Sequence, residues 1–261
     1  MITEIPIVKF YPWKIVFYRE LDGYYRKPSD ILEVRKRAYS GLITKSAQSK
    51  IRDKILLLNY LSPRRKVFNT PLQKMVYFKL SFLTLTLSAE QNIPDKIITK
   101  DLLAPFIRHY RYLKLMNNYV WKAEKQKNGN IHYHIISDMF VTYSDLLNYW
   151  NKLQSKTDMI DKFQAKYGHR SPNSVDIRQV KSSKELGRYL AKYVSKSGSR
   201  IAGKTWDCAD GLNNFDFKTC IIDTKTSDFV DRVVSRYGGK VLQYDYCKVI
   251  YMDEKYYQLI N

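Results

Sequence analysis

The chain has 261 residues, and 44% of them are apolar, so we expect a globular protein built as one large domain or as a core with elaborated flanks. It carries 45 lysines and arginines against 25 acidic residues, a net charge of +20 that is spread along the whole chain. Such a charge is typical of nucleic-acid binding, although an anionic membrane or plain solubility would also explain it. The absence of a signal peptide and of any stretch near the roughly 20 apolar residues of a membrane span predicts an intracellular protein without a membrane partner.

Three cysteines, Cys208, Cys220 and Cys247, are odd in number and widely spaced. This arrangement suits neither a disulfide framework nor a CxxC metal site. We expect reduced, structural thiols.

The first strong strand signal is FLTLTLS, residues 82–88, in which leucines alternate with hydroxyl side chains. A mostly helical, basic stretch follows over residues 95–118. Residues 119–126, YVWKAEKQ, then predict a second strand, and residues 131–137, IHYHIIS, a third. The Asn-Gly pair between these two strands indicates a hairpin, so they should be antiparallel neighbours.

Beyond this hairpin we expect a helix capped by Ser144, with four residues facing inward: Leu146, Leu147, Trp150 and Leu153. A polar loop leads to a strand at residues 175–180, and Ser182 or Ser183 caps the next helix, with Glu185 near its third position. Towards the end of the chain we predict a helix at 227–237, a turn at Gly238-Gly239 and one strand over 241–252. The central order β, α, β, β, α, β, α predicts an α+β fold with an antiparallel sheet covered by helices.

Two of the four histidines lie two residues apart on a predicted strand, so His132 and His134 should project from the same face. Two imidazoles can hold a divalent cation if a third ligand joins them. A three-residue loop at 128–130 would place Gln126 opposite His132 and Glu124 opposite His134. A two-residue Asn-Gly turn would instead bring Lys125 and Ala123 there. In the alternative interpretation, the histidines are exposed side chains on a solvent-facing strand and bind no metal.

The helix after residue 180 carries Tyr189 and Tyr193 four residues apart, on one helical face. Lys192 and Lys196 flank this face. A separate apolar stripe of Leu186, Leu190 and Val194 would anchor the helix to the sheet, so the tyrosines are not needed for packing. Alternatively, they are amphipathic residues at the rim of a core.

In combination, the strand FLTLTLS, the segment from Glu124 through IHYHII, and GRYLAKYVSK at 187–196 resemble the ordered motifs of the HUH endonucleases. This superfamily contains rolling-circle replication initiators, relaxases and related transposases. The two-tyrosine form with an intervening lysine looks most like the replication initiation proteins of the Microviridae, the small single-stranded DNA phages. The resemblance covers residues 76–200, which predicts an endonuclease core between flanking segments 1–75 and 201–261, the latter packed on the core.

The resemblance implies an enzyme that nicks and rejoins single-stranded DNA at a replication origin. Mg²⁺ or Mn²⁺ would be held by His132, His134 and Glu124, with Gln126 as a further candidate. Tyr193 or Tyr189 would attack the phosphate, forming a 5′-phosphotyrosine and a free 3′-OH, and Lys192 would stabilise the developing charge. DNA contacts are expected from four basic residues: Lys196, Arg200, Lys204 and Arg178. A host helicase and DNA polymerase in the bacterial cytoplasm would be partners.

A further pattern, GSRIAGKT at 198–205, satisfies the P-loop consensus GxxxxGK[ST]. A P-loop must follow a buried strand and open a helix, whereas this pattern follows the tyrosine helix and runs into a poor helix start. We therefore interpret Arg200 and Lys204 as contacts to the DNA backbone. Two alternatives to a replication initiator remain: a relaxase or transposase of the same superfamily, and a non-catalytic single-strand binder with the same βαββαβ sheet.

Overall fold

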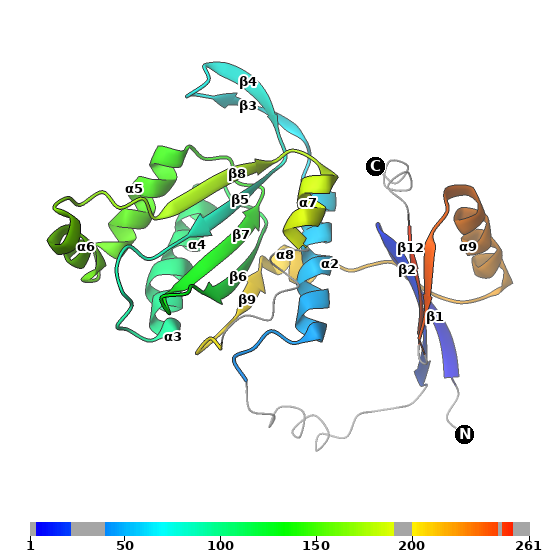
Figure 1. Cartoon of the computed structure of the whole chain (residues 1–261). Coiled ribbons are helices and arrows are strands. Elements are labelled where there is room, and N and C mark those ends of the chain that lie inside the picture. The colour runs from blue at the N-terminus through cyan, green and yellow to red at the C-terminus, as the bar shows by residue number, and fades with distance from the viewer. Residues whose placement is uncertain (1–3, 22–39, 191–199, 245–246, 253–261) are drawn as a thin grey trace. The chain divides into compact units, whose positions relative to one another are not determined.

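The computed structural model describes residues 4–21, 40–190, 200–244 and 247–252 (Figure 1). The chain divides into two compact units. Unit 1 combines residues 1–38 with 215–261, and unit 2 comprises residues 39–214. These units are defined by contacts between residues of the chain. The ranges 1–75, 76–200 and 201–261 were defined by sequence motifs, and that division stays a prediction.

Unit 2 is built on a five-stranded sheet in the order β8-β5-β7-β6-β9, in which all neighbours are antiparallel. Its strands are β5 (Leu80–Leu85), β6 (Tyr119–Lys125), β7 (Ile131–Ser137), β8 (Val175–Val180) and β9 (Trp206–Cys208). Helical segments α3 (Asp95–Ile98), η1 (Thr99–Leu103) and α4 (Ala104–Tyr112) connect β5 to β6, and α5 (Tyr143–Gln154) and α6 (Met159–Tyr167) connect β7 to β8. This βαββαβ order confirms the predicted α+β fold.

The two faces of this sheet follow from the alternation of its strands. Leu83 and Leu85 lie opposite Ile135 and Tyr133 and are fully buried with them on one face. Helices close this face: the Tyr133 hydroxyl lies 2.8 Å from Thr99 Oγ1 of η1, and Trp150 of α5 donates a hydrogen bond to the Thr86 carbonyl. His132 and His134 therefore stand on the other face.

Further helices in the described part of unit 2 lie outside this βαββαβ core: α2 (Lys45–Leu61), α7 (Ser183–Tyr189) and α8 (Asp210–Asn213). Thr44 caps α2 by accepting from the Ala47 amide. Ser182 caps α7 by accepting from the Glu185 amide, which confirms the predicted cap. Strands β3 (Arg65–Asn69) and β4 (Lys74–Phe78) form a separate two-stranded hairpin that projects from the sheet (Figure 1).

Two local predictions were wrong. Thr142, not Ser144, caps α5, because its hydroxyl accepts the Asp145 amide. The stretch predicted as a polar loop contains helix α6, which ends at Gly168 in a left-handed conformation with φ of 78°.

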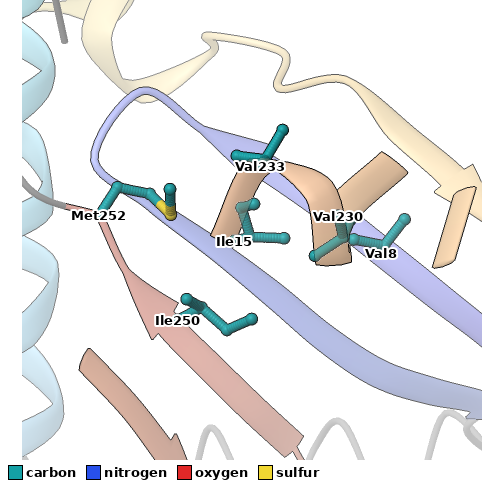
Figure 2. Close-up of a cluster of buried hydrophobic side chains, with 6 residues drawn as sticks. All are labelled: Val8, Ile15, Val230, Val233, Ile250 and Met252. Atoms are coloured by element: carbon teal, nitrogen blue, oxygen red, sulfur yellow. The ribbon is translucent and has the colours of Figure 1, made fainter. Parts of the chain in front are cut away.

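Unit 1 is a second antiparallel sheet, ordered β10-β1-β2-β12-β11, with helix α9 (Thr224–Tyr237) on one face. Its strands are β1 (Glu4–Tyr11), β2 (Lys14–Leu21), β10 (Thr219–Ile221), β11 (Lys240–Gln243) and β12 (Cys247–Tyr251). Figure 2 shows its core, in which six apolar side chains meet: Val8, Ile15, Val230, Val233, Ile250 and Met252. The single strand predicted over 241–252 is wrong, since β11 and β12 pair with each other.

The three cysteines are free thiols, as predicted. Among the helices that the structure describes, none combines the length and apolar character that crossing a membrane requires.

Candidate metal site

The β6–β7 hairpin brings Glu124, His132 and His134 together. Its loop is Lys127–Gly129, closed by the Gln126 amide on the Asn130 carbonyl at 2.8 Å and the Gly129 amide on the Gln126 carbonyl at 3.0 Å. Gly129 takes φ of 85°, which a residue without a Cβ adopts at little cost.

This loop sets the register of the two strands. Glu124 lies directly opposite His132, and Lys122 lies opposite His134. The predicted register, with Gln126 opposite His132, was wrong by two residues because the loop begins one residue earlier than expected. A shift of two keeps every side chain on its face, so the three candidate ligands still share one side of the sheet.

The ligand atoms of Glu124, His132 and His134 all lie within 4.8 Å of one another. Glu124 Oε2 is 3.3 Å from His134 Nε2 and 3.8 Å from His132 Nε2. The side chains are 17%, 5% and 16% exposed for Glu124, His134 and His132 respectively, so the cluster lies largely away from water.

His132 gives the strongest indication that this cluster fits a metal ion. Both its ring nitrogens are buried, and neither has a hydrogen-bond partner among the residues that the structure describes. Such an orphaned polar group costs free energy unless a ligand satisfies it. Two imidazoles and one carboxylate are a donor set for a divalent cation, so the residues fit an ion of the class predicted from the sequence.

The protonation states suit the same role. The His132 and His134 rings facing Glu124 hold the pKa of its carboxyl well below the ordinary value, although burial acts in the opposite direction. Burial lowers the pKa of His134, and Glu124 opposes that shift only in part. An ionised carboxylate and a neutral imidazole are the forms that bind metals.

Thr84 supports the cluster from the neighbouring strand. It lies opposite His134 in the β5–β7 ladder, and its Oγ1 is 3.2 Å from His134 Nδ1, which orients the ring and leaves Nε2 towards Glu124. Lys122 is only 2% exposed on the same face. Neither residue was predicted to belong to the site, although Lys122 has the same parity as Glu124 along β6 and Thr84 belongs to the hydroxyl-bearing side of the strand predicted from FLTLTLS.

The tyrosine helix packs on this face of the sheet. The ring of Tyr189 meets that of Phe82 edge-on at 4.5 Å between centroids, and Phe82 stacks on His134 at 5.6 Å. Tyr189 is only 8% exposed and buried together with Leu186, so the prediction that it is not needed for packing was wrong. Tyr193, Lys192 and Lys196 lie outside the described residues.

The remaining predicted residues surround the cluster less closely. Gln126 follows Lys125, the last residue of β6, and its backbone amide and carbonyl form the hydrogen bonds that close the loop. Arg178 is exposed and pairs with Asp176 of its own strand at 3.0 Å, Lys204 pairs with Asp207, and Arg200 is exposed. Strand β9, and not a helix, follows the P-loop-like pattern.

Comparison with known proteins gives a family match. The model of the replication-associated protein ORF2 family matches residues 80–198, which contain Glu124, His132, His134 and both tyrosines. No curated protein and no solved structure matches the chain significantly. The family match supports a role in DNA replication and an interaction with DNA. Over residues 80–198, this chain is thus similar to the replication-associated proteins of the ORF2 family.

Proposed function

We propose that this protein initiates rolling-circle DNA replication by nicking and rejoining single-stranded DNA at an origin through a tyrosine nucleophile. The observation that carries the proposal is the cluster of Glu124, His132 and His134 on the sheet face that Tyr189 packs against. Within it, neither ring nitrogen of His132 has a hydrogen-bond partner among the described residues. The match of residues 80–198 to a replication-associated family supports the biological setting.

Chemically, a tyrosine hydroxyl with an ordinary pKa of about 10 is a weak nucleophile and must be aimed at an activated phosphate. Mg²⁺ or Mn²⁺ held by His132, His134 and Glu124 would supply that activation by withdrawing charge from the scissile phosphate. Tyr193 or Tyr189 attacks phosphorus, the bond from phosphorus to the 3′ oxygen breaks, and the phenol proton is passed on so that the leaving oxygen becomes a 3′-OH.

Both products of this step, the 5′-phosphotyrosine and the free 3′-OH, have a use in replication. The 5′-phosphotyrosine conserves the phosphodiester energy, so the step is reversible without ATP, and the free 3′-OH primes a DNA polymerase. A second tyrosine can cleave the regenerated junction and pass the strand back for circularisation. Lys192 lies between the two tyrosines in the sequence, and its charge would stabilise the phosphate. Strand separation falls to a host helicase.

The test is incubation of the purified protein with Mn²⁺ and labelled single-stranded circular DNA, followed by denaturing electrophoresis and peptide mapping. We expect a covalent adduct at Tyr189 or Tyr193. His132→Ala should abolish the adduct and retain most DNA binding, whereas His169→Ala, which changes an exposed loop histidine, should leave both unchanged.

An adduct formed equally well by His132→Ala and His134→Ala would overturn the metal assignment. No adduct across a panel of origin sequences, despite salt-sensitive binding, would favour a non-catalytic single-strand binder. Nicking of a transfer origin or of transposon ends, instead of a replication origin, would identify a relaxase or a transposase.

A further inference from the structure

The hairpin β3–β4 displays an apolar face to solvent. Its register places Lys66 opposite Tyr77 and Phe68 opposite Met75, so these four side chains share one face of the ribbon. Phe68 is 51% exposed, Met75 56% and Tyr77 52%, and Leu72 at the tip is 58% exposed. Four large apolar side chains gathered on one short ribbon mark an interaction surface, because isolated exposed residues are ordinary but clusters are not.

Every charged residue of the hairpin segment is basic. Residues 63–80 contain five cations and no acidic residue, the cations being Arg64, Arg65, Lys66, Lys74 and Lys79. Two of them already lie over the ring of Tyr77: the Arg64 guanidinium is 4.5 Å from its centre, and Lys66 Nζ is 5.5 Å from it. A partner for this surface must therefore offer both negative charge and flat apolar groups.

The base of the hairpin is fixed to the sheet, so its exposed face has a defined orientation. Arg65 donates to the Asp138 carbonyl at 2.7 Å and lies over the Phe78 ring. The side-chain amide of Gln179, on β8, donates to the Tyr77 carbonyl. A two-stranded ribbon is marginal by itself, and these anchors explain how it stays folded with its apolar face exposed.

We propose that the β3–β4 hairpin binds single-stranded DNA, with Phe68, Met75 and Tyr77 as a stacking platform for unpaired bases and the surrounding cations as phosphate contacts. Unpaired bases present their flat faces, and base–aromatic stacking combined with basic side chains is the physical basis of single-strand binding. Paired bases hide those faces in the duplex stack and offer only edges to a ribbon in the major groove. The absence of acidic residues from 63–80 favours a polyanion over a protein partner.

The position of the hairpin suits the same DNA strand that the metal site would act on. β5 begins at Leu80, two residues after β4 ends, and Thr84, which contacts His134, lies four residues further along β5. At about 3.3 Å per residue, the six residues from the end of β4 at Phe78 to Thr84 span about 20 Å, the distance from the base of the hairpin to the level of the site. The inference thus rests on the proposed function for its DNA substrate, but the binding itself needs neither metal nor tyrosine.

The test is fluorescence anisotropy with a labelled single-stranded oligonucleotide in EDTA, where no nicking can occur. The double variant Phe68→Ala/Tyr77→Ala should bind about 30-fold more weakly, as expected for the loss of stacking on two rings. The double variant Tyr167→Ala/Phe229→Ala is the matched control, because it removes one tyrosine and one phenylalanine that are 54% and 48% exposed, and it should bind like the parent. Arg64→Gln/Lys66→Gln should reduce the salt dependence of binding by about one to two counterions.

A second measurement does not depend on variant folding. The parent protein, irradiated with an oligonucleotide that contains 5-bromodeoxyuridine, should crosslink within residues 65–78. Unchanged affinity of the Phe68→Ala/Tyr77→Ala variant, equal loss for blunt duplex DNA, or crosslinks that avoid this segment would each overturn the proposal. Failure of the nuclease proposal would appear differently, as hairpin-dependent binding without any tyrosine adduct.

Discussion

The two five-stranded antiparallel sheets of this molecule each pack an apolar face against helices, but the unit 2 sheet also carries a polar cluster on its second face. In unit 1, alternate residues of β1, β2 and β12 meet α9 in the apolar cluster of Figure 2. In unit 2, one face is equally apolar, whereas the other carries Glu124, His132 and His134 beneath the packing of Tyr189 on Phe82. Similar architecture therefore serves stability in one sheet, and in the other it also carries the proposed metal site.

The comparison also shows why the unit 2 site is ordered. His132 and His134 alternate with Ile131, Tyr133 and Ile135, which are all fully buried. The packed side of β7 thus fixes the backbone that positions the candidate ligands on its other side. Ligands on rigid strands with supporting contacts keep their geometry better than ligands on loops.

The largest expected effect on stability comes from cutting the apolar core of unit 1. Ile15→Ala, at a fully buried position, should destabilise this unit by about 4 kcal/mol, the cost of lost burial plus a cavity. Hydrogen exchange of peptides from β1 and β2 should speed up, and metal affinity should stay as in the parent. The matched variant Ile135→Ala, equally buried behind His134, should reduce both stability and metal affinity. Equal loss of metal affinity in both variants would contradict the separation of roles.

Within unit 2, Asp95 should act on stability without touching the metal ligands. Burial raises the pKa of its carboxyl, but hydrogen bonds from Lys125, Gln91 and the Ala202 amide outweigh that effect and leave the pKa below its ordinary value. Asp95→Asn should destabilise unit 2 by about 2 kcal/mol at neutral pH, because it weakens a charge-assisted network.

The pH dependence of this effect has a defined sign. A carboxyl with a lowered folded-state pKa contributes stability that is present above its unfolded pKa of about 3.9 and is lost as the pH falls through the folded value. Urea denaturation at pH 7 and at pH 3 should therefore show the parent and Asp95→Asn converging at acid pH. A difference in unfolding free energy between parent and variant that is the same at both pH values would show that the lost stability does not come from the ionised carboxylate.

A smaller effect, on metal affinity alone, is expected from a change at Thr84, which lies on the sheet face of the candidate metal site. Thr84→Val keeps the shape of the side chain but removes the hydroxyl beside His134 Nδ1, and metal affinity should fall about 10-fold. Thr84→Ser should restore most of the affinity. Calorimetric titration with Mn²⁺ measures both, and unchanged binding by the valine variant would remove Thr84 from the site.

The smallest effect concerns the turn that sets the register. Gly129→Ala should cost about 1 kcal/mol, because alanine disfavours the φ of 85°, while the added Cβ meets nothing within 4 Å. Mn²⁺ affinity should stay within a few-fold of the parent if the register holds. Gly129→Asn is the control, since asparagine tolerates this conformation better. A loss of metal binding as large as that of His132→Ala would indicate that the hairpin had slipped.

Much of unit 2 was predictable because its signals are local. Strands 131–137 and 175–180 agree residue for residue with β7 and β8, and Ser182 caps α7 as expected. The turn at Gly168 was recognised, but α6 before it was missed because this helix is only nine residues long. The pairing of β1 and β2 with strands from the other end of the chain had no counterpart in the sequence analysis, since nothing local specifies such distant partners.

By itself, the sequence determined which side chains share a face. Alternation along the strand places His132 and His134 on one side, and Glu124 joins them for any loop length that keeps the parity of the register. Only the tertiary structure decided that Glu124 faces His132, that Tyr189 is buried against Phe82, and that β3–β4 exposes its apolar face. The physical reason is range. Side-chain direction is a property of successive residues, whereas register, burial and exposure depend on backbone turns and on contacts between segments far apart in the chain.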